Sequence, residues 1–235
     1  LLEQLEKHIP FAEDIEITLE ANPGTTEATR FRGFLAAGVN RLSIGVQSFN
    51  DAHLKALGRI HDGDAAIDAI KTARSVGFER INVDLMHGLP EQTLAAGLAD
   101  VEQALALGVT HLSHYQLTLE PGTAFFSRPP QLPNDDERFD IEAACAERIA
   151  ASGLERYEIS AWATPDQACR HNLNYWEFGD YLALGAGAHG KISQPDGPIQ
   201  RYRRVRLPRL YQSLAGTPEA IAESHEVSAN QRPLE

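Results

Sequence analysis

Three strand-like segments carry a polar residue at every second position, and this alternation limits the folds open to the chain. They cover residues 15–20 (IEITLE), 42–47 (LSIGVQ) and 81–86 (INVDLM). Each lies beside a helix-like stretch, so we expect them to pair in parallel, and strands of parallel sheets are normally apolar on both faces. Because polar groups without partners are costly to bury in a dry core, the second face of this sheet is predicted to line a cavity for a large polar ligand.

A repeated phrase supports a βα organisation. A helix-like stretch ends in small residues and a glycine before each of four strands, at Gly38, Gly77, Gly108 and Gly153. Glycine is favoured just past a helix end because it adopts the left-handed conformation without strain. Strand spacings of roughly 30 to 45 residues suit crossover connections through a helix. The chain is therefore predicted to be α/β, with a barrel and a doubly wound sheet both open.

Composition excludes several classes of protein. The 235 residues are 43% hydrophobic with a formal net charge of −12, which is globular and argues against a nucleic-acid partner. Two cysteines are too few for a disulfide framework, so a reducing, cytoplasmic location is expected. No apolar run approaches the ~20 residues of a membrane span, and no signal peptide is visible. Because Leu1 lies inside a helix-like stretch, we expect the chain to be part of a longer protein.

The last third of the chain has a different character. Residues 134–137 (NDDE) cap a helix predicted over 137–151, and a short strand is expected near Tyr157. An aromatic- and glycine-rich stretch then runs to Gly190, and a basic run follows over 201–209, whose simplest interpretation is a solvated surface. We therefore divide the chain into a βα part over 1–160 and the start of a second domain over 161–235.

Polar side chains occur at or near the ends of four successive strands: Glu20, Gln47, Asp84 and Gln116. In α/β barrels the active site is built at this edge. For one residue alone, the capping of a turn is the simpler interpretation, but four on an already polar face favour a binding site. Carboxylates and amides suit hydroxyl and ammonium groups, and Arg59 can clamp a carboxylate, although a plain surface arginine stays open. The predicted ligand is thus an amino acid joined to a ribose. No Walker-type or GxGxxG loop follows the first strand.

Several strings in order resemble one family. They are TLEANPG (18–24), GVQSF (45–49), LKALGRIH (54–61), NVDLMHGLP (82–90) and HYQLTLEPGT (114–123). Together they resemble radical S-adenosylmethionine proteins related to oxygen-independent coproporphyrinogen III oxidase. Within that family, RHNLNYW (170–176) and LGAGAHG (184–190) resemble the heme chaperone branch, whose motif is HNxxYW. The resemblance runs from about residue 10 to residue 212.

The resemblance implies a partial TIM-like barrel, of which this chain holds the last four βα units of six, followed by the start of a C-terminal domain. It implies that Glu20, Gln47, Arg59 and Asp84 contact S-adenosylmethionine, and that Gln116 and His189 stand where relatives make further contacts of varying residue type. The family's CxxxCxxC loop and GGTP strand are absent and are expected upstream of Leu1. Cys145 and Cys169 have the wrong spacing to replace them, so a 4Fe-4S cluster is expected only in the complete protein.

The resemblance also implies a heme site. His171 is the candidate ligand of the heme iron, with Asn172, Tyr175 and Trp176 beside it; the alternative is that the aromatic residues are core anchors. The expected function is a cytoplasmic heme chaperone that passes heme to an acceptor protein, without implied turnover. Its rival is oxygen-independent coproporphyrinogen III oxidase, and a hydrolytic or aldol barrel using Asp84 and His87 lacks a supporting lysine or metal triad. The acceptor, the cleavage of S-adenosylmethionine and the oligomeric state, a homodimer included, stay open.

Overall fold

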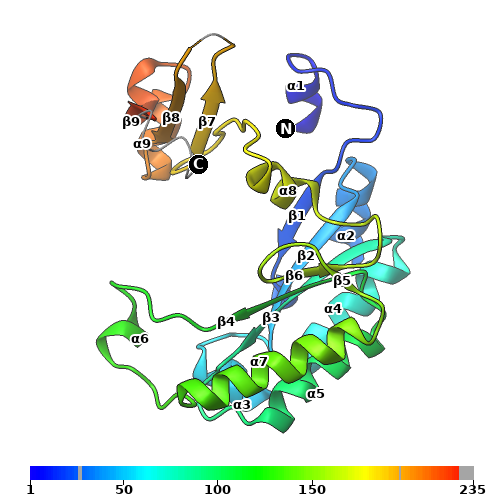
Figure 1. The fold of residues 1–235 in the computed structure, drawn as a ribbon. Helices are drawn as coiled ribbons and strands as arrows, with labels where there is room; N and C mark the ends of the chain where they lie inside the picture. Colours follow the sequence, from blue (N-terminus) through cyan, green and yellow to red (C-terminus); the bar gives the residue numbers. More distant parts are fainter. Residues whose placement is uncertain (26–27, 196, 228–235) are drawn as a thin grey trace. The chain divides into compact units, whose positions relative to one another are not determined.

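The chain forms two compact units, one over Leu1–Ala168 and one from Cys169 onward (Figure 1). This computed structural model describes residues 1–25, 28–195 and 197–227. Strand β6 (Ala161–Ala163) lies just past residue 160, where the sequence suggested a boundary, and it is hydrogen-bonded to the sheet of the first unit. The compact units therefore meet eight residues further along the chain, and each is described by itself.

The first unit is built on one six-stranded sheet. Its strand order is β1-β2-β3-β4-β6-β5. The strands before β6 are β1 (Thr18–Ala21), β2 (Arg41–Gln47), β3 (Arg80–His87), β4 (His111–Gln116) and β5 (Glu155–Arg156). Strands β1 to β4 pair in parallel, whereas β6 runs antiparallel to both β4 and β5. The predicted α/β fold with a parallel sheet is confirmed.

Helices follow the parallel strands as expected of βα units. The first unit contains α1 (Leu2–Glu6), η1 (Pro23–Thr25), α2 (Ala28–Ala36), α3 (Asp51–Ala56), α4 (Gly63–Ser75), α5 (Leu94–Ala106), α6 (Ala124–Ser127) and α7 (Asp135–Ala150). Helix α7 starts at a capping box, in which Asn134 accepts from the Glu137 amide and Glu137 accepts from the Asn134 amide. The predicted glycines end the helices in the left-handed region, with φ of 100° at Gly38 and 107° at Gly77.

The helices cover one face of the parallel strands, and the core lies between them. Figure 1 shows α5 and α7 side by side along the sheet. Alternate residues of three strands are buried in this core, from Leu42 to Val46, from Ile81 to Leu85, and at Leu112. They pack against helical residues such as Ile70, Val101 and Ile141. Since strand side chains alternate between faces, this apolar face leaves the polar positions of the same strands on the opposite side.

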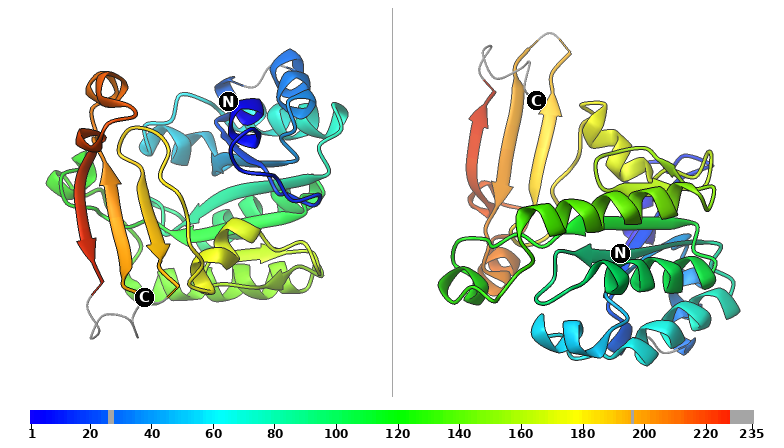
Figure 2. Two further views of the ribbon diagram at one scale, coloured as in Figure 1. Left: turned by 90° about the horizontal axis from the view of Figure 1, so that it is seen from above. Right: turned by 60° about the horizontal axis from the view of Figure 1, so that its bottom comes forward.

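The second unit contains a separate three-stranded antiparallel sheet (Figure 2). Its elements are α8 (Arg170–Trp176), β7 (His189–Ser193), β8 (Ile199–Arg204), α9 (Pro208–Leu214), η2 (Pro218–Ala220) and β9 (Ile221–Glu226). The basic run that sequence reasoning assigned to a solvated surface supplies the central strand, β8. A Cβ on Gly190 of β7 would collide with the ring of Tyr202, so only glycine lets that ring cross β7. Among the described residues, no helix has the length and apolar character needed to cross a membrane.

Candidate functional site

Polar side chains from four strands share the face of the sheet opposite the helices. The parallel register places Glu20 beside Ser43 and Ser43 beside Asn82. It also places Asp84 beside Ser113, and Met86 beside Tyr115. We call this set of side chains the polar face: Glu20, Ser43, Gln47, Asn82, Asp84, Ser113 and Tyr115. The alternation seen in the sequence therefore becomes one continuous surface in the first unit.

The centre of the polar face is a hydrogen-bonded network. The Asn82 amide donates to Ser43 Oγ at 2.9 Å and to Asp84 Oδ1 at 2.8 Å. Ser43 Oγ donates to Asp84 Oδ2 at 3.3 Å, and Ser113 Oγ donates to Asn82 Oδ1 at 3.1 Å. These contacts satisfy the buried Asn82, as buried polar groups require, and they fix the position of the Asp84 carboxylate.

Gln47 is held in an unusual backbone conformation at the end of β2. Its φ is 71°, in the left-handed region that non-glycine residues rarely adopt, and the strand register shifts between Gly45 and Gln47. Its side-chain Oε1 accepts a hydrogen bond of 2.8 Å from the Tyr115 hydroxyl. A Cβ on Gly45 would lie 3.0 Å from Gln47 Nε2, so the glycine leaves room for the amide. Strained residues of this kind cluster at ligand sites, which supports a binding role.

The charged residues predicted for the site lie close enough to act on one another. Burial and the negative charge of Asp84 raise the pKa of the Tyr115 hydroxyl, while the positive charge of Arg59 opposes the rise. The pKa of Asp84 is raised, mainly by burial, and the charge of Glu20 adds to the rise although hydrogen bonds from neighbouring side chains oppose it. The charges of Glu20, Arg59 and Asp84 therefore all act on the Tyr115 hydroxyl.

Buried polar residues brace the turn that carries Gln47 and Arg59. Asp100 of α5 accepts hydrogen bonds of 2.7 Å from both the Ser48 hydroxyl and the Phe49 amide. The ring of His61, just beyond Arg59, contacts the Val46 carbonyl through Nε2 at 3.1 Å. The segment from β2 to α4 is thus tied to the core at both ends.

Two residues that sequence reasoning considered are not on the polar face. Gln116 pairs with His87, and its Cγ would lie 3.4 Å from a Cβ on Gly88, beside Arg138 of α7. Gln116 is therefore on the helix side, one position out of phase with Tyr115. His87 is buried there and stacks on His114 at 4.7 Å between ring centroids, so it cannot act together with Asp84. Tyr115 was missed, although alternation from Ser113 would have identified it.

The candidate heme residues lie on the short helix α8 of the second unit. The rings of His171 and Tyr175, one helical turn apart, are in edge contact at 4.9 Å. Tyr175 and Trp176 are 45% and 52% exposed, so neither is a core anchor. Asn172 is partly buried beside them. An exposed imidazole next to exposed aromatic rings suits a flat, apolar, iron-bearing ligand.

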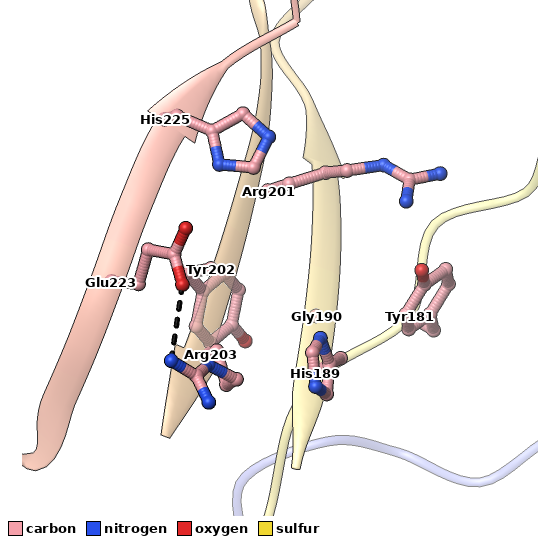
Figure 3. Close-up of a pocket in the computed structure, with 8 residues that line it drawn as sticks. All are labelled: Tyr181, His189, Gly190, Arg201, Tyr202, Arg203, Glu223 and His225. Carbon is pink, nitrogen blue, oxygen red and sulfur yellow. Dashed lines mark hydrogen bonds and ion pairs between the residues drawn. The ribbon is translucent and has the colours of Figure 1, made fainter. Parts of the chain in front are cut away.

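His189 also belongs to the second unit, where it lines a cavity of about 180 Å³ (Figure 3). The cavity lies on the β7-β8-β9 sheet. Its other lining residues are Tyr181, Gly190, Arg201, Tyr202, Arg203, Glu223 and His225. Cationic and aromatic side chains predominate in this lining, which suits an anionic ligand better than a metal ion.

The residues present fit S-adenosylmethionine but not an iron–sulfur cluster. The polar face offers carboxylates and amides, and Arg59, whose charge acts on Tyr115, offers a guanidinium; these match the hydroxyl, ammonium and carboxylate groups of that cofactor. Cys145 and Cys169 are both buried, and burial raises the pKa of the Cys145 thiol to about 12, which disfavours the thiolate that iron requires. Within the described ranges, no cluster of three metal-binding side chains occurs.

Comparison with known proteins decides the family. The family model of the radical SAM superfamily matches residues 1–104. The chain is 49% identical over all 235 residues to the heme chaperone HemW of Haemophilus influenzae, covering 60% of that protein. The chain is therefore similar to the radical SAM superfamily over residues 1–104 and to HemW over its whole length. HemW of Escherichia coli strain K12 is also 49% identical over the whole chain, which covers 61% of it.

More distant relatives agree with this assignment. The chain is 40% identical over 214 residues to the mouse mitochondrial radical S-adenosyl methionine domain-containing protein 1, covering 89% of the chain and 48% of that protein. It superposes on coproporphyrinogen III oxidase (HemN) of Escherichia coli with a TM-score of 0.80 at 23% identity, covering 97% of the chain and 55% of HemN. That likeness confirms the partial-barrel fold. The chain spans about 60% of the length of the two HemW proteins.

Proposed function

We propose that the protein containing this chain is a heme chaperone that binds S-adenosylmethionine on the polar face, binds heme at α8 and passes heme to an acceptor protein. The main support is the 49% identity, over the whole chain, to proteins named heme chaperone HemW. The exposed His171, Tyr175 and Trp176 on α8 add an independent physical reason, because exposed aromatic side chains grouped in one place mark binding surfaces. Both cysteines are buried and neither is in a disulfide, which agrees with a cytoplasmic location.

In this proposal Arg59 and the two carboxylates of the polar face each hold one part of S-adenosylmethionine. Arg59 binds the carboxylate of the methionyl group through its planar fork, and Glu20 and Asp84 accept hydrogen bonds from ribose hydroxyls or the ammonium group. The Gln47 amide, held by Tyr115, contributes further hydrogen bonds. The cofactor supplies radical chemistry elsewhere in the superfamily only with an iron–sulfur cluster, for which the two buried cysteines of this chain are unsuited. The proposal here is binding, with the cluster assigned to the rest of the protein.

Calorimetry tests the cofactor site. Arg59→Ala in the full-length protein should weaken S-adenosylmethionine binding at least about tenfold, because a charge-assisted bidentate contact is lost. Arg32→Ala, which removes an exposed arginine from α2, is the matched control and should leave the affinity unchanged. Equal affinities for the Arg59 variant and the parent protein would refute the assignment.

Absorption spectroscopy tests the heme site. His171→Ala should shift the Soret band and weaken hemin binding, because the iron loses its axial imidazole. His8→Ala, in an exposed position of the first unit, serves as the control. A His171 variant with the parent spectrum and affinity would show that His171 is not the ligand.

Coproporphyrinogen III oxidase activity is the alternative to be tested directly. HemN shares the fold at 23% identity, and a likeness at that level carries no substrate. The full-length protein, loaded with its cluster, should bind heme and leave coproporphyrinogen III undecarboxylated. Formation of protoporphyrinogen would favour the oxidase instead.

A further inference from the structure

One face of the β7-β8-β9 sheet gathers cationic side chains in two cross-strand rows. The antiparallel register aligns His189, Arg203 and Glu223 in one row. It aligns Lys191, Arg201 and His225 in the other. Residues directly opposite in antiparallel strands point to the same face. We call this surface the cationic face; in Figure 3 the guanidinium of Arg201 extends across β7 towards Tyr181.

The basic groups of this face differ in what they contact. Lys191 is buried, and its ammonium donates to the Phe178 carbonyl at 2.7 Å and lies over the Phe178 ring, whereas Arg201, directly opposite, lines the cavity. The carboxylate in the cavity lining, Glu223, is in an ion pair of 3.1 Å with Arg203, in the other row. A chain with a net charge of −12 thus concentrates positive charge on one small sheet. Such a concentration is expected where an anionic group binds.

The cationic face is physically continuous with the candidate heme residues. Tyr181 extends the row of Lys191 and Arg201, because its backbone exchanges hydrogen bonds of 3.0 and 2.9 Å with that of Lys191. The ring of Tyr181 contacts the ring of Tyr175 at 4.7 Å, and Tyr175 contacts His171. All of these residues belong to the second unit. A ligand whose ring lies against His171 and Tyr175 would therefore have its edge near Arg201.

We propose that the cationic face binds the propionate carboxylates of the heme whose iron is held by His171. This inference rests on the proposed function, since it requires heme at α8. A heme is a flat apolar ring with two carboxylates on one edge, which matches aromatic side chains leading to a cationic row. The cavity, of about 180 Å³, is below the several hundred Å³ of a typical cofactor pocket and suits the carboxylate arms rather than the macrocycle. Arg201 supplies the bidentate donor that carboxylates favour.

The first experiment compares hemin with its dimethyl ester, which keeps the iron and the ring but lacks both carboxylates. Arg201→Gln should weaken hemin binding by about tenfold, the effect of one charge-assisted hydrogen bond, and leave binding of the ester unchanged. Arg209→Gln, at an exposed position of α9, should bind both probes like the parent protein. An Arg201 variant with parental hemin affinity would overturn the proposal.

A second variant is expected to change the hemin affinity in the opposite direction, which a misfolded protein would not do. Glu223→Gln removes the negative charge beside Arg203, so hemin should bind about twofold to fivefold more tightly while the ester is unaffected. A weaker or unchanged hemin affinity would contradict the proposal. His171→Ala distinguishes heme binding at α8 from carboxylate binding on the cationic face. If His171→Ala alters the binding of both probes while the Arg201 and Glu223 variants alter the binding of neither, heme binding at α8 is supported and the carboxylate site is refuted.

Discussion

Asp84 illustrates how a residue proposed to bind the cofactor can lower the stability of the fold that carries it. Its carboxylate is fixed by Asn82 and Ser43, yet burial raises its pKa. A raised carboxyl pKa means that the ionised form is disfavoured in the folded state relative to the unfolded state. The loss of folding stability caused by ionised Asp84 is therefore complete at neutral pH. It disappears as the pH falls through the folded pKa and the carboxylate takes up a proton.

Asp84→Asn should therefore stabilise the protein while weakening its cofactor site. At neutral pH we expect the free energy of unfolding to rise by about 1 kcal/mol, as is common when a functional site is neutralised. Urea titration measures this gain, which should shrink in acid as Asp84 of the parent becomes protonated. A lower urea midpoint for the variant at neutral pH would show that the carboxylate is structural.

Tyr115 is expected to position Gln47 through its hydroxyl. Tyr115→Phe removes the donor to the Gln47 amide, whose side chain is buried, so the free energy of unfolding should fall by about 1 kcal/mol. A double-mutant cycle with Gln47→Ala isolates the contact and should give a coupling energy of about 1 kcal/mol. Additive effects of the two changes would mean that the hydroxyl does not hold the amide.

At the scale of elements, Asp100 links helix α5 to the turn that follows β2. Asp100→Ala leaves the buried Ser48 hydroxyl and the Phe49 amide without their acceptor, so we expect a loss of about 2–4 kcal/mol in unfolding free energy. Asp68→Ala on the exposed side of α4 is the control, with a change within about 0.5 kcal/mol. Hydrogen exchange at the Phe49 amide should accelerate in the Asp100 variant alone; an unchanged rate would contradict the link.

The elements that follow local rules were predictable from the sequence, and those that depend on pairing partners were not. The capping box at Asn134 and the glycine after α2 act within a few residues, so the sequence reveals them. The first strand was predicted from residue 15, but β1 begins at Thr18, because the Asn40 side chain takes the place of a neighbouring strand at the Ile15 carbonyl and the Ile17 amide. The β7-β8-β9 sheet was missed, although β7 and β8 are neighbours in the sequence, because the basic residues of β8 were interpreted as a solvated surface.

The candidate site likewise contains residues that the sequence predicted correctly and others that it did not. Period-two alternation placed Glu20, Gln47 and Asp84 on one face, since the strand geometry fixes side-chain direction. Position at a strand end was a poorer guide: it selected Gln116, which the pleat turns to the helix side, and overlooked Tyr115. A residue's face therefore predicts its neighbours better than its distance from the strand end.

At the scale of the whole molecule, buried histidines should make the protein sensitive to acid. Burial lowers the pKa of His111 to about 4 and that of His114 to about 3, and it lowers the pKa of His87 as well. Groups with depressed pKa values stay neutral in the folded state while the unfolded chain takes up protons below about pH 6.5. Stability should therefore fall as the pH drops from about 6.5, and the loss should be complete below about pH 3.

Urea midpoints at about pH 7.5 and pH 5 measure this acid effect. His114→Gln should reduce the loss of stability between the two values, because one depressed group is removed. His8→Gln, which changes an exposed histidine, should leave the loss as in the parent. An equal loss in the His114 variant and the parent would assign the acid sensitivity to other groups.

The division into two compact units predicts that the two ligands stabilise different parts of the chain. A bound ligand raises the free energy of unfolding of the unit that binds it, by an amount set by the ligand concentration relative to its dissociation constant. Amide exchange through local opening measures this increase separately for each region. S-adenosylmethionine should therefore slow amide exchange in β1 to β4, and hemin should slow it in α8 and β7 to β9, when each is added alone to the full-length protein. Arg59→Ala should abolish the protection by S-adenosylmethionine and keep the protection by hemin. With hemin at limiting concentration, Arg201→Gln should abolish the protection by hemin and keep that by S-adenosylmethionine. Protection by hemin confined to β1 to β4 would place heme on the polar face and contradict the assignment of the two ligands to separate units.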